Sequence, residues 1–314
     1  MAYINVNDAD ELLNQMEEIL TDGIKRSKEL ADGIIPSYLI HHVKDYKKTG
    51  LINHLGYETV LPLSFEVETI PPFLEATARV LKLGKEFYKK EDYLKIQSTE
   101  IYDKKLKFYK TCADIDNAPF EIGRVHAFTK GWLERECNFL HMTYKYLLGL
   151  LKAGYYEEFY YEIKNNFPIY MDPYVYGRSI IENSSFIVPT CNPDDELHGQ
   201  GFFARLTGAN SEVLNIITIM FLGDKVFDVN ENNELIFCLS PKLSSKLFDE
   251  NNEAKFTLFS NVLITYHNEN RINTYDAKNI YYVINNIKYD SICGQLAQDI
   301  RNGKVSNIDV FIEG

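Results

Sequence analysis

The residues with the clearest chemical potential lie in a short loop that runs into an apolar helix. Thr207, Gly208 and Ser211 directly precede the apolar run at 213–217. The first turn of a helix combines backbone N–H groups that lack helical partners with the positive end of the helix dipole, and such a turn binds anions. The two hydroxyls add donors, and the glycine lets the backbone approach a ligand closely. Arg205, just upstream, can add a guanidinium group that donates two parallel hydrogen bonds to an anion. The loop therefore predicts an anion site.

The same residues have a plainer interpretation. Asn210 or Ser211 can act as an ordinary N-cap, which is the commoner role of these residue types at a helix start. His198 lies a few residues upstream between Leu197 and Gly199. Its ring can donate to a phosphate or to a sugar hydroxyl, or it can be satisfied by neighbouring backbone groups.

Two other stretches carry groups suited to sugar chemistry. The connector at 112–130 contains Asp114 and Asp116, and glycosidic chemistry needs a carboxylic acid to protonate the leaving oxygen. Glu182 and Asn183 can orient sugar hydroxyls. Alternatively, these acidic residues are solvated surface groups or cap a turn. The sequence has no G-x-S-x-G motif, no Walker loop and no convincing Cys/His pair.

Composition narrows the class of protein. The chain has 314 residues, 45% of them hydrophobic, and a net charge of −12. That charge argues against a broad nucleic-acid-binding surface but not against a small anion pocket. The five cysteines are far apart and show no metal-ligand spacing, which predicts free thiols and no metal site. Because no signal sequence or membrane-spanning segment is evident, we expect a cytoplasmic protein without a membrane partner.

Helical periodicity dominates the first two thirds of the chain. Apolar spacing and capping residues predict helices, and a Pro- and Gly-containing connector at 112–130 interrupts them. The expected helices cover residues 8–33, 71–90, 91–110, 131–154, 155–166 and 211–223.

After about residue 225 the pattern changes to short alternating runs separated by Asn- and Asp-rich turns. The runs at 234–240, 254–259, 262–266 and 280–284 are typical of strands in an antiparallel β domain. We therefore expect two domains, a helical one at 1–224 and an antiparallel β domain at 225–314.

Several segments occur in the order found in a known family. HAFTKGW at 126–132, PYVY at 173–176 and LTG at 206–208 are followed by a helix end at Leu222-Gly223 and the β region. This arrangement resembles the C-terminal portion of cellobiose phosphorylase and its relatives, family 94 of the glycoside hydrolases. The stretch YGRSIIENSSFIVPTCNPDDELHGQGFFARLTG, residues 176–208, is especially similar to large cellobiose-phosphorylase-like proteins.

The resemblance implies a fold and a reaction. The fold would be multi-domain, α then β: part of an (α/α)6 barrel built of helical hairpins, followed by a small antiparallel β-sandwich or jelly-roll-like domain. The reaction would be inverting phosphorolysis of a β-glucoside to a sugar 1-phosphate, with inorganic phosphate as co-substrate and no cofactor. By match to family motifs, Thr207 and Gly208 would bind phosphate. By order along the chain, His126 would also contact phosphate and Glu121 would bind sugar.

The sequence also departs from the family. The general-acid Asp of the family lies in a W-N-D motif that is absent here, and Trp132 is the only tryptophan. The N-terminal β-sandwich and most of the barrel are absent too. We therefore expect the C-terminal portion of a phosphorylase, inactive alone, whose partners are an oligosaccharide or β-glucan, phosphate, and either the missing N-terminal half or a second copy. The alternative is a non-catalytic carbohydrate-binding module or a structural module that completes a barrel.

Overall fold

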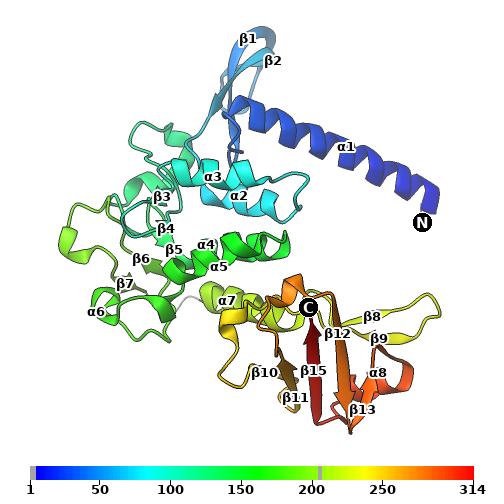
Figure 1. Ribbon diagram of the computed structural model, residues 1–314. Helices are drawn as coiled ribbons and strands as arrows, with labels where there is room; N and C mark the ends of the chain where they lie inside the picture. Colours follow the sequence, from blue (N-terminus) through cyan, green and yellow to red (C-terminus); the bar gives the residue numbers. More distant parts are fainter. Residues whose placement is uncertain (1–4, 204–206) are drawn as a thin grey trace. The chain divides into compact units, whose positions relative to one another are not determined.

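A computed structural model describes residues 5–203 and 207–314, and it separates into two compact units (Figure 1). The first unit comprises Met1–Gly149 and Glu162–Ala209, and the second comprises Leu150–Tyr161 and Asn210–Gly314. The expected domain division after residue 224 stays a prediction.

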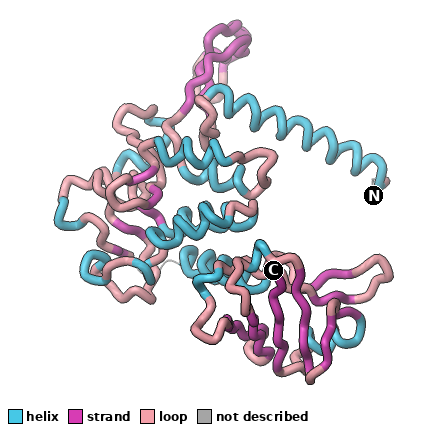
Figure 2. The backbone as a smooth tube through the Cα atoms, viewed as in Figure 1, coloured by secondary structure: helices cyan, strands magenta, loops and turns pink. Residues whose placement is uncertain are grey.

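Helices and short strands alternate in the first unit (Figure 2). The longer elements are α1 (Val6–Leu30), β1 (Leu39–Ile52), β2 (Glu58–Thr69), α2 (Leu74–Leu81), α3 (Lys90–Ser98), α4 (Leu140–Lys152) and α5 (Tyr156–Asn166). The short strands are β3 (Tyr102–Asp103), β4 (Phe108–Tyr109), β5 (Asn138–Phe139), β6 (Phe186–Ile187) and β7 (Gly201–Phe202). The remaining helical segments are short: η1 (Phe120–Ala127), which Gly123 interrupts with a φ of 80°, η2 (Pro168–Tyr170), α6 (Pro173–Tyr176) and η3 (Asp195–Leu197). The final residues of α4 and the first residues of α5 belong to the second unit.

The amino-terminal region projects from the body of the first unit (Figure 1). Helix α1 begins at an N-cap formed by Asn5, whose side chain accepts from the backbone N–H of Asp8. Strands β1 and β2 then form an antiparallel hairpin with Val43 opposite Phe65. Both elements leave large apolar side chains exposed.

The core of the first unit lies around α2 and α4. Gly149 of α4 meets Leu81 of α2 so closely that a Cβ atom on the glycine would lie 2.9 Å from the leucine side chain. This approach requires glycine at that position, because the helix backbone itself packs against Leu81.

A ladder of stacked rings stabilises the three-stranded sheet, whose strand order is β5-β6-β7. Trp132 stacks on Phe202 with ring centroids 4.0 Å apart, and Phe186 lies between Phe202 and Phe139 at 5.4 and 4.6 Å. Each strand is only two residues long, so side-chain stacking rather than the hydrogen-bond ladder holds this sheet together.

The second unit contains the C-terminal strands. Helix α7 (Thr207–Leu222) leads into them, with its first three residues still in the first unit. A five-stranded sheet has the order β10-β11-β15-β12-β13, in which β11 and β15 run parallel and the other neighbours antiparallel. A smaller sheet has the order β14-β9-β8, and α8 lies beside β9 and β14. The bounds are β8 (Phe227–Val229), β9 (Leu235–Phe237), η4 (Ser245–Leu247), β10 (Glu253–Leu258), β11 (Val262–His267), η5 (Thr274–Asp276), β12 (Asn279–Ile284), β13 (Ile287–Tyr289), β14 (Ile292–Cys293), α8 (Gly294–Arg301) and β15 (Asn307–Glu313).

The expected fold class is wrong. Within residues 5–203 and 207–314 there is no closed helical barrel, and the last part is a mixed sheet with a helix rather than a purely antiparallel sandwich or jelly roll. In the first unit, three small antiparallel sheets stand between the helices where paired helical hairpins were expected.

Two local features explain the difference. The helix expected over 91–110 ends at Ser98, and Lys107 adopts a φ of 58° in the turn between β3 and β4. The helix expected from Gly131 begins only at Leu140, because Leu133 and Glu136 have φ values of 54° and 57°. A left-handed backbone conformation cannot continue a right-handed helix.

Candidate functional site

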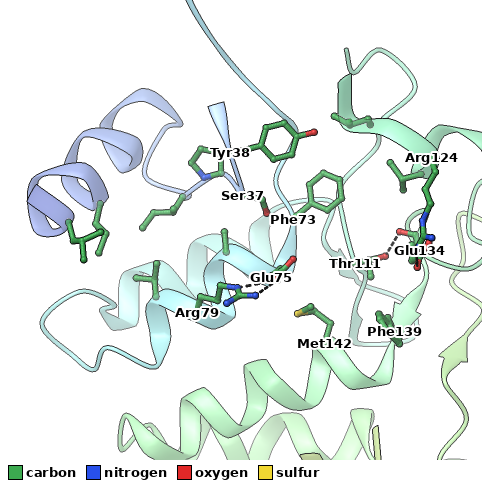
Figure 3. A pocket seen from close by; sticks show the side chains of 18 residues that line it. Ser37, Tyr38, Phe73, Glu75, Arg79, Thr111, Arg124, Glu134, Phe139 and Met142 are labelled. Carbon is green, nitrogen blue, oxygen red and sulfur yellow. Dashed lines mark hydrogen bonds and ion pairs between the residues drawn. The ribbon is translucent and has the colours of Figure 1, made fainter. Parts of the chain in front are cut away.

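A large cavity in the first unit has a volume of about 970 Å³ and an apolar lining (Figure 3). Phe73 stands at the N-cap of α2, Phe139 is the last residue of β5, and Met142 lies in the first turn of α4. Leu20 and Ile24 of α1 also line it. The volume is typical of small-molecule sites, which combine apolar walls with a few polar groups that orient the ligand.

Two ion pairs supply most of the polar groups of this cavity and lie on opposite sides of it (Figure 3). On α2, Arg79 donates through Nε and Nη2 to Glu75 Oε1 at 3.0 and 2.6 Å. Across the cavity, Arg124 Nη2 donates to Glu134 Oε1 at 2.8 Å. The guanidinium groups are largely exposed, so both can still contact a ligand.

Thr111 fixes the backbone that carries Glu134. Its hydroxyl lies 2.8 Å from the carbonyl oxygen of Glu134 and 3.0 Å from that of Cys137. Both carbonyls can only accept, so the hydroxyl proton is shared between them. This anchor holds the Glu134 main chain in the wall of the cavity.

Tyr38 places a phenol at the edge of the cavity. Its hydroxyl donates to the backbone carbonyl of Glu121 at 3.4 Å. Desolvation and the nearby Glu121 carboxylate raise the pKa of the phenol. The group therefore stays protonated at neutral pH and can act as a hydrogen-bond donor.

Gly208 and His141 lie in contact at the first turns of α7 and α4. A Cβ atom on Gly208 would lie 2.5 Å from Nδ1 of His141 and 2.7 Å from its Cγ. The edge of the same imidazole meets Phe139, with ring centroids 5.6 Å apart. Phe139 itself lines the large cavity, whereas His141 and Gly208 are not among its lining residues. Arg205 lies outside the described residues, and so does the side chain of Thr207.

The two predicted catalytic carboxylates lie in a separate ionic cluster. Lys130 Nζ bonds Asp114 and lies 3.7 Å from Asp116, which Arg135 also holds. Hydrogen bonding to the Lys130 ammonium holds the pKa of Asp114 below its usual range. Asp114 is therefore ionised at neutral pH, whereas a general acid must arrive protonated.

This cluster borders a second cavity, of about 480 Å³. Asp114 and Lys130 share its wall with the buried pair formed by Lys110 and Glu136, whose Nζ and Oε1 atoms lie 3.1 Å apart. Charged groups dominate this space, so it differs in chemistry from the apolar first cavity.

Replacing Lys130 with methionine is expected to raise the pKa of Asp114 towards its ordinary value, because the principal hydrogen bond to the carboxylate is lost. A carboxyl ¹³C NMR titration of the wild type and of Lys130→Met measures the change. Lys304→Met, which removes an exposed partner of Asp299, serves as the control and should leave the Asp114 titration unchanged. An Asp114 midpoint that is the same in all three proteins would contradict the assignment.

The two histidines predicted to contact phosphate are tied to backbone carbonyls. His126 Nε2 lies 3.2 and 3.3 Å from the carbonyls of Ala118 and Pro119. His198 Nε2 lies 2.9 Å from the carbonyl of Asn192. A carbonyl only accepts, so both Nε2 atoms carry a proton and donate. These bonds fix loops, and a phosphate-binding role for either residue stays a prediction.

The predicted sugar-binding residues also have partners within the protein. Glu182 accepts from Arg178 at 2.8 Å, and Asn183 Oδ1 accepts from the hydroxyl of Tyr144 at 2.6 Å. Glu121 is exposed in η1. No predicted site residue in the described part of the chain lines the large cavity, so their roles in binding sugar stay predictions.

The sequence interpretation missed His141, Glu134 and Phe139. The sequence signal for these residues was weak. His141 lies two positions after Phe139 at the start of an apolar run, much as Thr207 and Gly208 stand just before a second apolar run. The single-helix prediction over 131–154 placed these residues inside a helix. It therefore missed the turn and strand that bring Glu134 and Phe139 to the cavity.

No protein-family model and no curated protein matches the chain. In residues 5–203 and 207–314, no group of three or more His, Cys, Asp or Glu side chains could hold a metal ion. Over the same residues, no helix has both the length and the apolar character needed to cross a membrane.

Proposed function

We propose that this chain is the C-terminal portion of a carbohydrate phosphorylase for cellobiose-like β-glucosides. It binds a sugar in the large cavity and inorganic phosphate beside His141 and Gly208. The single observation that carries the proposal is the contact between these two residues at the starts of two helices. The contact brings His141 of α4 beside the Thr207-Gly208 motif of α7, which was the basis of the predicted phosphate site.

The groups around His141 and Gly208 support phosphate binding. The first turns of α4 and α7 each present a positive dipole end, and two such ends favour an anion more than one does. The imidazole of His141 adds a donor when it is protonated or in the right tautomer. Glycine at 208 leaves the space that any side chain would take from the ring.

Sugar binding follows from the cavity lining. Phe73, Phe139 and Tyr38 offer apolar ring faces, and the pairs Glu75–Arg79 and Arg124–Glu134 offer donors and acceptors at opposite ends. This combination suits a pyranose, which has apolar C–H faces and a polar rim. Phe139 contacts both the cavity and His141, so sugar and phosphate would meet there.

The proton donor to the leaving oxygen is the missing group. In inverting phosphorolysis, phosphate attacks the anomeric carbon while a carboxylic acid protonates the departing sugar oxygen. Asp114 stays ionised beside Lys130 and does not line the large cavity. In the proposal the acid comes from another segment or chain, and this chain alone binds without turning over.

Incubation of the purified chain with cellobiose and phosphate is expected to release no sugar 1-phosphate. A coupled enzymatic assay for glucose 1-phosphate measures this, with an active cellobiose phosphorylase as positive control. Robust release by this chain alone would overturn the assignment of a missing acid and would call for Asp114→Asn and Asp116→Asn variants.

A second candidate function is a carbohydrate-binding module without catalysis. The observation that favours it is that both carboxylates of the large cavity, Glu75 and Glu134, are already held by arginine side chains rather than pointing unpaired at a leaving group. Calorimetry with cellobiose, in the absence and presence of phosphate, separates the two functions. Sugar binding with no heat from phosphate favours the module, whereas binding of both favours the phosphorylase portion.

A further inference from the structure

The second cavity of the first unit, about 480 Å³ in volume, contains an ionic site that the proposed function does not use. At its wall, Lys110 Nζ lies 3.1 Å from Glu136 Oε1, and the two side chains are only 8% and 1% exposed. The volume lies within the range of small-molecule sites. Burying two charges costs free energy that apolar side chains of similar size would not, so a buried ion pair facing a cavity points to a role beyond stability.

Backbone hydrogen bonds fix both members of this pair. Lys110 directly follows β4, and its backbone N–H donates to the carbonyl of Ile101 at 2.6 Å. The next residue, Thr111, donates its backbone N–H to the carbonyl of Cys137 at 2.8 Å, and Cys137 directly follows Glu136. The segments that carry the lysine and the carboxylate are therefore bonded to each other, which keeps the two groups in a fixed geometry.

The Glu136 carboxylate keeps one oxygen unused. Oε1 accepts from Lys110, whereas Oε2 is buried and accepts no hydrogen bond within the described residues. Lys130 Nζ lies 3.7 Å from Oε2, which is beyond hydrogen-bond range. The neighbouring Asp103, by contrast, accepts two bonds from backbone N–H groups and two from Thr190. A buried carboxylate oxygen without a donor is costly, and a ligand hydroxyl would satisfy it.

Lys110 is the best-placed nucleophile of this cavity. Burial and a neighbouring cation activate lysine amines in proteins, and Lys110 is buried and shares the Glu136 carboxylate with Lys130. Cys191 Sγ lies 3.9 Å from Lys110 Nζ, but burial raises the pKa of this thiol to about 11, so it stays protonated at neutral pH. Lys130 stays an ammonium, because its hydrogen bond to Asp114 raises its pKa.

We propose that Lys110 forms a Schiff base with the keto group of a small 2-oxo acid. The Lys110 ammonium passes one proton to Glu136, and the free amine adds to the carbonyl carbon. A second proton moves from the nitrogen to the former carbonyl oxygen, which gives a carbinolamine hydroxyl. Glu136 then returns its proton to this hydroxyl, which leaves as water while the nitrogen lone pair forms the C=N bond. Ammonium and ketone thus give a protonated imine and one water, and no other reactant is needed.

Two exposed lysines of the same wall define the class of ligand. Lys104 and Lys105 line the cavity, and neither forms an ion pair with another described residue. Two available ammonium groups in the same cavity as a nucleophilic amine suit a ligand with a carboxylate beside its carbonyl group, and a 2-oxo acid carries these groups on adjacent carbons. The inference is independent of the proposed function, because Lys104, Lys105, Lys110 and Glu136 do not line the large cavity.

Borohydride trapping of the full chain with pyruvate tests the proposal. Borohydride reduces a Schiff base to a stable secondary amine, so the wild type is expected to gain one carboxyethyl group at Lys110, which peptide mass spectrometry locates. Lys110→Arg keeps a positive charge beside Glu136 and should lose this label. The matched control is Lys225→Arg, which changes an exposed lysine of the second unit and should keep the label. A wild type in which Lys110 is labelled no faster than Lys225 would overturn the proposal.

Two further variants test the groups around Lys110. Glu136→Gln should slow trapping at Lys110 by about 100-fold, a typical contribution of a general acid–base group. Circular dichroism establishes that this variant is folded, and if it is not, the Lys110→Arg comparison decides. Lys105→Met should raise the pyruvate concentration for half-maximal trapping several-fold, but leave trapping of hydroxyacetone, which has no carboxylate, unchanged. An unchanged rate in folded Glu136→Gln, or an equal effect of Lys105→Met on both ketones, would contradict the proposed chemistry.

Discussion

Replacing Gly208 with valine is expected to weaken binding of inorganic phosphate by roughly 10- to 100-fold, the equivalent of losing about one hydrogen bond to a charged group. The added Cβ would lie 2.5 Å from Nδ1 of His141, so the imidazole or the first turn of α7 must move. Either movement separates the two groups that we propose to hold the anion. Calorimetric titration with phosphate measures the loss.

The matched control for Gly208→Val is Thr218→Val on the same helix. The hydroxyl of Thr218 bonds only the carbonyl of Leu214 one turn earlier, far from the first turn of α7. This variant should bind phosphate like the wild type. Cellobiose binding should survive in both variants, which would show that the fold is intact. Undiminished phosphate binding by Gly208→Val would contradict the proposed position of the anion.

Replacing Glu162 with leucine is expected to lower the free energy of unfolding by about 2–4 kcal/mol, because a buried donor that loses its acceptor costs about 1–3 kcal/mol. Glu162 is fully buried on α5. Its Oε1 accepts from Tyr93 Oη at 2.6 Å, Tyr109 Oη at 2.8 Å and Gln97 Nε2 at 2.8 Å. Leucine fills the space but removes the carboxylate that all three groups use, although Gln97 Nε2 keeps its bond to Tyr93 Oη at 2.8 Å. Urea denaturation measures the change.

Glu157→Leu, on the same helix, is the control for this variant. The Glu157 carboxylate is exposed and accepts one hydrogen bond, from Tyr275, so its loss should cost less than about 1 kcal/mol. Equal stabilities of Glu162→Leu and Glu157→Leu would contradict a structural role for the buried network.

Glu162→Gln adds a test by pH. Burial raises the pKa of Glu162 above 4.5, despite the hydrogen bonds that favour the carboxylate. The folded state therefore binds the proton more tightly than the unfolded state. The resulting stabilisation is present below pH 4.5 and is lost as the pH rises through the folded-state pKa. The stability of the wild type should fall relative to that of Glu162→Gln as the pH rises from 4.5 to 7.

Elements with strong local signals were predicted well. The expected helix at 155–166 is confirmed as Tyr156–Asn166, and the strand expected at 262–266 is confirmed as Val262–His267. In both, the apolar period and the flanking turn residues agree with the final structure. Where a backbone reversal depends on left-handed residues other than glycine, as at Leu133 and Glu136, sequence pattern gives no warning.

For the candidate site, the sequence by itself determined the Thr207-Gly208 motif, the acidic net charge and the absence of a W-N-D motif. Only the tertiary structure decided that His141 stands against Gly208, and that Asp114 is held ionised beside Lys130. The physical reason is how far apart the interacting residues lie along the chain. A helix start is a property of neighbouring residues, whereas residues 141 and 208 are separated along the chain by α5, α6, β6 and β7 and meet only in the folded first unit.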